Sequence, residues 1–124
     1  MSRESKHFLI LDDEETIRQS IAAYMEDEGY RVFQAESTEQ GLGFVKAHPI
    51  DAAVVDIRLP GEDGNTFMLE ARKIRPNIKF VVHTGSADYV LPESILRLGV
   101  TEDLVLIKPV RDLSALCDIL NRQS

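Results

Sequence analysis

Five polar residues in this sequence have side chains that could bind a metal ion and an anion together. They are Asp12, Asp13, Asp56, Thr84 and Lys108. Each stands at the end of a short, mostly apolar run, such as Phe8–Leu11 before the Asp pair. Such runs are typical of buried parallel strands, and open α/β sheets place their sites where the carboxyl ends of the strands meet. We therefore expect these five side chains to share one crevice.

The three carboxylates would repel one another in such a crevice unless a hard cation lay among them. Mg²⁺ takes oxygen ligands and is commonly held by one or two carboxylates together with phosphate oxygens. The ammonium of Lys108 and the hydroxyl of Thr84 would then contact an anion beside the metal. These residue types predict a Mg²⁺ site that also receives an anionic group.

The elements that must position these residues alternate along the chain. Apolar runs alternate with segments of helical periodicity, which predicts an α/β protein with a parallel sheet. The expected strands are 8–11, 31–35, 52–56, 79–83 and 104–107. The expected helices begin after Asp13, at 38 (ending at 48), at 65 (ending at 74), near 91 and near 113, with loops at 59–64 and 86–90. Ser37 is the expected cap of the second helix, with Gln40 three residues on.

Composition excludes several classes of protein. A chain of 124 residues is expected to form one domain. A net charge of −7 argues against direct nucleic-acid binding, which needs a basic surface. A single Cys excludes an internal disulfide and favours the cytoplasm. There is no apolar run long enough to cross a membrane and no signal-peptide core, so no membrane partner is expected.

Four motifs, in order and at suitable spacing, closely resemble the receiver domain of two-component response regulators. They are Ile10–Glu14, Val54–Pro60 with Asp63 and Gly64, Val82–Gly85, and Ile107–Pro109. The resemblance extends from Lys6 to about Asn121. It implies the flavodoxin-like, doubly wound (βα)5 fold of the chemotaxis receivers, with five parallel strands in the order 2-1-3-4-5. Residues 1–124 would form a single receiver domain, with no output domain in this sequence.

The resemblance implies a phosphorylation-dependent signalling switch. Asp56 would accept a phosphoryl group, in the presence of Mg²⁺, from a sensor histidine kinase or a histidine-containing phosphotransfer protein. The protein would not be an enzyme beyond self-phosphorylation and autodephosphorylation. Phosphorylation would change its binding to an unidentified downstream protein, and a weak homodimer is compatible with this role.

The same resemblance assigns the remaining roles. Asp13 would bind Mg²⁺ directly, Asp12 directly or through water, and the backbone carbonyl of Arg58 would be a further ligand beside Asp56. Lys108 would pair with the phosphoryl oxygens or, in the resting protein, with Asp56, and Thr84 would donate its hydroxyl. The bond from Lys108 to Pro109 would be cis.

Other interpretations of these residues remain. Asp12 and Asp13 could simply cap the first helix and complement its dipole. An enzyme of the haloacid-dehalogenase type would need a second acid where Arg58 stands, and an interaction module without phosphorylation would not need all five polar residues. His83 precedes Thr84 on a strand, so it should face the opposite side and pack in the core or under a helix.

The chain departs from the receiver pattern at three places. Val105 stands where many receivers carry an aromatic residue, so we expect a phosphoryl group to affect mainly the loops 58–64 and 86–91. The stretch from Gly99 to Lys108 is long, which predicts either a longer loop at 100–103 or an extended fourth helix. Glu62 adds a charge to a loop that is usually apolar there. Glu14 is expected on the first helix, pointing away from the site.

Overall fold

A five-stranded parallel sheet forms the centre of the protein. The structure is a computed structural model, and it describes residues 6–109 and 112–122. The strands are β1 (His7–Leu11), β2 (Arg31–Ala35), β3 (Ala52–Val55), β4 (Lys79–Thr84) and β5 (Val105–Ile107). Their order across the sheet is β2-β1-β3-β4-β5, and all four pairings are parallel. The expected doubly wound architecture and strand order are therefore confirmed.

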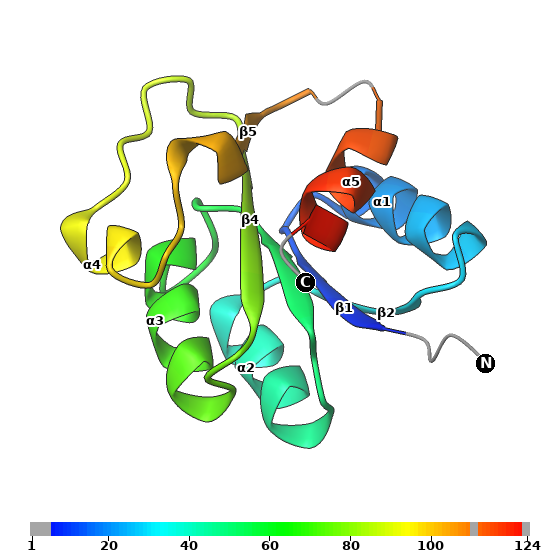
Figure 1. The fold of residues 1–124 in the computed structure, drawn as a ribbon, viewed down its shortest axis with the longest axis horizontal. Coiled ribbons are helices and arrows are strands. Elements are labelled where there is room, and N and C mark those ends of the chain that lie inside the picture. The colour runs from blue at the N-terminus through cyan, green and yellow to red at the C-terminus, as the bar shows by residue number, and fades with distance from the viewer. Residues whose placement is uncertain (1–5, 110–111, 123–124) are drawn as a thin grey trace.

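Helices cover both faces of this sheet. They are α1 (Glu15–Asp27), α2 (Thr38–Ala47), α3 (Gly64–Ile74), α4 (Glu93–Leu96) and α5 (Ser114–Arg122), with a 3₁₀ turn at Glu102–Leu104. Helices α1 and α5 lie on one face, and α2, α3 and α4 on the other (Figure 1). Within the described residues, no helix combines the length and apolar character that crossing a membrane requires.

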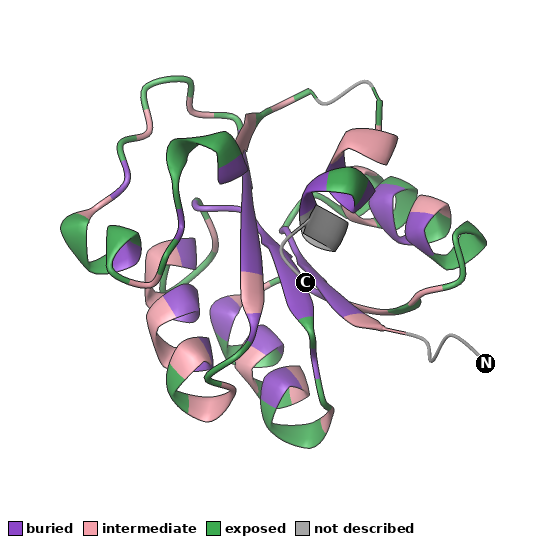
Figure 2. Cartoon of the chain, in the orientation of Figure 1, coloured by how far each residue is buried: buried purple, intermediate pink, exposed green. Residues whose placement is uncertain are grey.

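The central strands are buried because both of their faces are covered. All four residues of β3, and every residue of β1 except His7, are buried, as the purple strands in Figure 2 show. The sequence of a strand that is covered on both faces is a continuous apolar run, rather than an alternation of apolar and polar residues. This is why the apolar runs located the strands correctly, and why the first polar residue after each run lies at the edge of the sheet.

The polar ends of three strands are tied to the sheet by backbone hydrogen bonds. The amide of Asp12 donates to the carbonyl of Ala35 at 3.0 Å, and the amide of Asp56 donates to that of Leu11 at 2.9 Å. The amide of Lys108 donates to the carbonyl of Thr84 at 2.8 Å. The sheet therefore fixes the backbone at each of these charged residues one position beyond the strand.

The structure corrects several expected boundaries. Strand β3 ends before Asp56, β4 includes Thr84, and Leu104 belongs to the 3₁₀ turn rather than to β5. The second helix ends at Ala47 and the third begins at Gly64, each one residue from the expected position.

The fourth helix differs most from its expected form. Helix α4 begins at Glu93 instead of near 91, because Pro92 has an extended backbone (φ −62°, ψ 154°) and serves as its N-cap. Residues 100–104 continue as a loop with the 3₁₀ turn, so the longer loop is correct and the extended helix is wrong.

Side-chain caps fix where two helices begin. Ser37 accepts a hydrogen bond from the amide of Gln40 at 3.2 Å, as expected, while the Gln40 side chain accepts one from the amide of Glu36. Asp63 accepts from the amide of Thr66 at 3.0 Å and so caps α3. The Asp63 cap, which the sequence interpretation did not assign, closes the loop that follows β3.

Gly64 lies so close to the backbone after β3 that a side chain would not fit there. A Cβ atom at this position would lie 2.2 Å from the carbonyl oxygen of Asp56 and 2.9 Å from Cγ1 of Val55. The amide of Gly64 also donates to the carbonyl of Ile57 at 2.9 Å. The start of α3 thus packs directly against the backbone of Asp56.

We predict that Gly64→Ala lowers the free energy of unfolding by about 1–3 kcal/mol, because a backbone oxygen cannot move aside as a flexible side chain can. Gly43→Ala is the control, since a Cβ at Gly43 in α2 would meet no atom within 4 Å. The free energy of unfolding of this control should rise by about 0.5–1 kcal/mol, because alanine lowers the entropy of the unfolded chain. Urea denaturation measures both, and equal effects in the two variants would contradict the role of the close contact.

Candidate functional site

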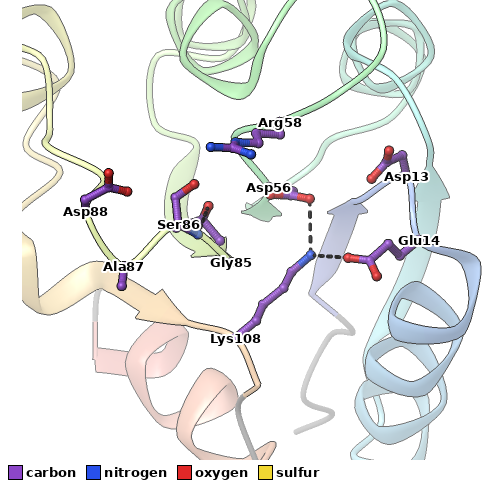
Figure 3. Close-up of a pocket in the computed structure, with 10 residues that line it drawn as sticks. Asp13, Glu14, Asp56, Arg58, Gly85, Ser86, Ala87, Asp88 and Lys108 are labelled. Atoms are coloured by element: carbon purple, nitrogen blue, oxygen red, sulfur yellow. Dashed lines mark hydrogen bonds and ion pairs between the residues drawn. The ribbon is translucent and has the colours of Figure 1, made fainter.

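A polar cleft of about 510 Å³ lies at the carboxyl edge of the sheet. The loops that follow β1, β3, β4 and β5 contribute its walls (Figure 3). Its lining residues are Asp13, Glu14, Asp56, Arg58, Thr84, Gly85, Ser86, Ala87, Asp88 and Lys108. The crevice predicted from the sequence is therefore present, and Asp13, Asp56, Thr84 and Lys108 line it.

Lys108 is the centre of an ion-pair network that includes Asp12. Its Nζ atom lies 2.9 Å from Oδ2 of Asp12, 3.0 Å from Oε1 of Glu14 and 3.2 Å from Oδ2 of Asp56. Figure 3 shows the Lys108 side chain extending from the end of β5 toward Glu14 and Asp56. The peptide bond between Lys108 and Pro109 is cis, as the resemblance implied. The expected resting pair of Lys108 with Asp56 is present, but two further carboxylates share the ammonium.

The environment shifts the pKa of both partners in the pair between Asp56 and Lys108. Burial raises the pKa of the Asp56 carboxyl above its usual value; Lys108 opposes this shift, and the charge of Asp12 adds to it. Burial by itself lowers the pKa of the Lys108 ammonium. The hydrogen bonds to Asp12 and Glu14, together with the charges of Asp12 and Asp56, outweigh burial, so the pKa of Lys108 is raised. Lys108 therefore stays protonated, whereas ionisation of Asp56 is less favourable than in water.

Asp12, Asp13 and Asp56 form a group that could hold a metal ion. One carboxylate oxygen from each of them lies within 4.8 Å of the other two. Hard oxygen donors from clustered carboxylates suit Mg²⁺ or Ca²⁺. Asp12 also accepts a hydrogen bond from the amide of Glu14 at 2.9 Å. Glu14 is the N-cap of α1 and no side chain caps this helix, so the interpretation of Asp12 and Asp13 as helix caps is wrong.

Thr84 is buried at the end of β4, next to Gly85 at the cleft. Its Oγ1 accepts a hydrogen bond from the amide of Ser86 at 3.2 Å. A hydroxyl can accept and donate at the same time, so this bond leaves Thr84 able to donate to an anion in the cleft.

His83 does not line the polar cleft. It is buried and lines a second cavity under α1, with Ile17, Ile21 and Lys108, which agrees with the expected core position. Burial, together with the charge of Lys108, lowers the pKa of its imidazole, so the ring is neutral at pH 7.

Two features of the site were not anticipated from the sequence. Glu14 precedes α1 and contacts Lys108, so the expectation that it points away was wrong. The hydroxyl of Tyr89, in the loop before α4, donates to Oδ1 of Asn65 in α3 at 2.6 Å. Burial and the charge of Asp63 raise the pKa of Tyr89 to about 12, so this phenol remains a donor. No local pattern could have revealed either contact, since each joins residues far apart in the sequence.

Comparison with known proteins points to one family. Residues 8–121 match the family model of the response regulator receiver domain. The response regulator GtcR of Aneurinibacillus migulanus is 35% identical over 115 residues, which is 93% of this chain and 46% of GtcR. The transcriptional regulatory protein AruR of Pseudomonas aeruginosa is 36% identical over 107 residues, 82% of this chain and 43% of AruR. The chain thus spans less than half the length of these two relatives.

Solved structures agree in fold. A CheY-like receiver domain from Methanospirillum hungatei is 31% identical with a TM-score of 0.82, and 97% of each chain is covered. A response regulator from Burkholderia pseudomallei, solved with a phosphorylated aspartic acid, calcium ion and citrate, is 26% identical with a TM-score of 0.82. That match covers 94% of this chain and 66% of the other.

We predict that Asp56→Asn stabilises the protein at pH 7 and that the gain disappears toward pH 3. The pKa of Asp56 is higher in the folded protein than in the unfolded chain. The parent therefore loses stability as the pH rises from the unfolded-state pKa through the folded-state pKa. Asn cannot ionise and avoids this loss, while Lys108 keeps Asp12 and Glu14 as partners. Urea denaturation at several pH values measures the difference. Asp27→Asn, at the exposed end of α1, is the control for loss of a surface charge, and a gain at pH 7 no larger than the control's would contradict the prediction.

Proposed function

The chain belongs to the response regulator receiver domain family, and on this premise we propose that Asp56 is its phosphoacceptor. Receiver domains are signalling phosphoacceptors. The observation that carries the assignment is that Asp56 and the Lys108 ammonium meet in the cleft, 3.2 Å apart, beside the cluster of acidic residues. A carboxylate is a weak nucleophile, and phosphoryl transfer to it depends on positioning and on neutralising charge. The sheet fixes the position of Asp56, and the Lys108 ammonium supplies positive charge beside it.

The side chains of this site have separate tasks in the proposed transfer. A carboxylate oxygen of Asp56 attacks the phosphorus of the donor in line, and the donor's leaving group departs with the electron pair of the broken bond. Lys108 would bind a phosphoryl oxygen through its ammonium, and Thr84 would donate a hydrogen bond to another; that both line the cleft supports these roles. The exposed Gly85 leaves room for the phosphoryl group beside Thr84.

We propose Asp12, Asp13 and Asp56, together with the backbone carbonyl of Arg58, as ligands of Mg²⁺. The proximity of the three carboxylates supports this assignment. When bound, the ion neutralises charge on the transferred group and helps to orient it. Asp13, which is exposed at the cleft, is free to turn toward the ion, whereas Asp12 is held by Glu14 and Lys108.

The proposed biological role is a phosphorylation-dependent switch. Receiver domains interact with histidine kinases or phosphotransfer proteins, and we propose such a protein as the donor for Asp56. Slow self-phosphorylation from small acyl phosphates and autodephosphorylation belong to the same proposal. Residues 1–124 would act as one cytoplasmic receiver domain that alters its binding to a downstream protein, or to a second copy in a weak dimer, when phosphorylated.

We predict that acetyl phosphate adds one phosphoryl group to the protein in the presence of Mg²⁺ and none in the presence of a chelator. Asp56→Asn should abolish the addition, because the amide cannot act as the nucleophile. Asp13→Asn should slow it, since that carboxylate belongs to the metal cluster. Intact-mass spectrometry measures the product. Uptake by Asp56→Asn equal to that of the parent would place the acceptor elsewhere.

We predict that beryllofluoride, which mimics a phosphoryl group, shifts the amide resonances of 58–64 and 86–91 more than those of β5 and α5. Val105 has no ring to reorient, whereas Tyr89 joins the loop before α4 to Asn65 of α3. Tyr89→Phe removes only the hydroxyl and should reduce the shift at Asn65. Shifts along β5 and α5 as large as those in the two loops would contradict this prediction.

A further inference from the structure

We propose that Glu14 is a positioning residue of this site, and that it holds the Lys108 ammonium in the unphosphorylated protein and releases it when Asp56 is phosphorylated. This inference rests on the proposed phosphorylation of Asp56. The contact that carries it is the ion pair of 3.0 Å between Oε1 of Glu14 and Nζ of Lys108 (Figure 3). Glu14 thereby competes with an incoming phosphoryl group for the same cation.

The hydrogen-bonding capacity of Lys108 makes the competition unavoidable. A lysine ammonium has three N–H donors. Three carboxylate oxygens lie within 3.2 Å of Nζ, from Asp12, Glu14 and Asp56. A phosphoryl oxygen can bind this ammonium only if one of these acceptors gives way.

Glu14 is the acceptor that can leave at the lowest cost. Its side chain is 59% exposed, so its carboxylate regains water as soon as it turns outward. The Asp12 side chain is only 3% exposed, and its other oxygen accepts from the amide of Glu14. A buried carboxylate without a partner is costly. Lys108 itself is 11% exposed and cannot follow Glu14 into solvent.

Phosphorylation also changes the charges in a way that favours this exchange. With acetyl phosphate as the donor, attack by Asp56 forms an O–P bond and breaks the P–O bond of the acyl phosphate, and the acetyl group leaves as acetate. The Asp56 oxygen then belongs to a mixed anhydride, while the phosphoryl group brings up to two negative charges. The phosphoryl oxygens become stronger acceptors for Lys108 than the solvated Glu14 carboxylate. The ammonium therefore moves from Glu14 to the phosphoryl group.

Glu14→Gln tests this exchange because it keeps the size of the side chain and removes its charge. We expect acetyl phosphate, at a fixed concentration below saturation and with Mg²⁺, to phosphorylate this variant about two to five times faster than the parent. That range follows from the usual strength of a partly exposed ion pair. The beryllofluoride complex should tighten by a similar factor. Glu15→Gln is the matched control, because Glu15 is the exposed neighbour that pairs with Gln19 and does not line the cleft. It should leave both quantities unchanged.

A double-mutant cycle separates this role from simple repulsion of the anionic donor. In a Lys108→Met background the Glu14→Gln substitution should have no effect on either quantity, because the shared cation is gone. The same acceleration with and without Lys108, or an equal acceleration by Glu15→Gln, would overturn the inference. So would unchanged rates in Glu14→Gln while the parent is phosphorylated normally. Absence of uptake by the parent itself would instead refute the proposed function.

Discussion

The ammonium of Lys108, shared among three carboxylates, is the interaction on which the rest of this structure depends. Asp12 follows β1, Asp56 follows β3 and Lys108 follows β5, so one cation links three strands at the carboxyl edge. Without it, buried Asp12 and Asp56 would face each other uncompensated, which is strongly destabilising. With it, the three carboxylates still outnumber the ammonium that they share, so the site stays acidic. Lys108 and the acidic cluster are therefore parts of one electrostatic unit.

The sheet and its connecting loops serve this unit by fixing backbone positions. Asp12, Asp56 and Lys108 each continue the hydrogen-bonding pattern of a neighbouring strand by one residue. Gly64 brings the start of α3 against the carbonyl of Asp56, where no side chain could fit. The charged groups are thus held at the edge of the hydrogen-bonded sheet, whereas the loop after β4 borders the cleft with exposed residues, among them Gly85, Ala87 and Asp88.

In the proposed mechanism, an exchange of partners connects the chemistry to the signalling. Lys108 would transfer from the solvated Glu14 carboxylate to a phosphoryl oxygen within the cleft. Thr84 is already bonded to the amide of Ser86, so a change at its hydroxyl reaches the loop before α4 directly. The bond between Tyr89 and Asn65 connects that loop to α3 and so to the loop after β3. The loop after β3 and the loop after β4 thus both lie next to the site where phosphorylation would change the charge.

The sequence by itself determined the class of fold and which polar residues lie at the carboxyl edge of the sheet. Buried strands require apolar runs, and a polar residue directly after each run must lie at the sheet edge, so local composition identified Asp12, Asp13, Asp56, Thr84 and Lys108. Helix limits were less certain, because Pro92 can occupy either the cap or the first turn, and the tertiary structure placed it at the cap.

Only the tertiary structure decided which of these residues touch, and through which partners. Glu14 was expected to point away because it follows the acidic pair at a helix start, yet it lies before α1 and reaches Lys108, 94 residues on. Asn65 and Tyr89 meet although neither belongs to a motif. Such contacts depend on the packing of loops from different strands. Periodicity and composition describe how each segment meets the core, and they carry no information on which loops become neighbours in space.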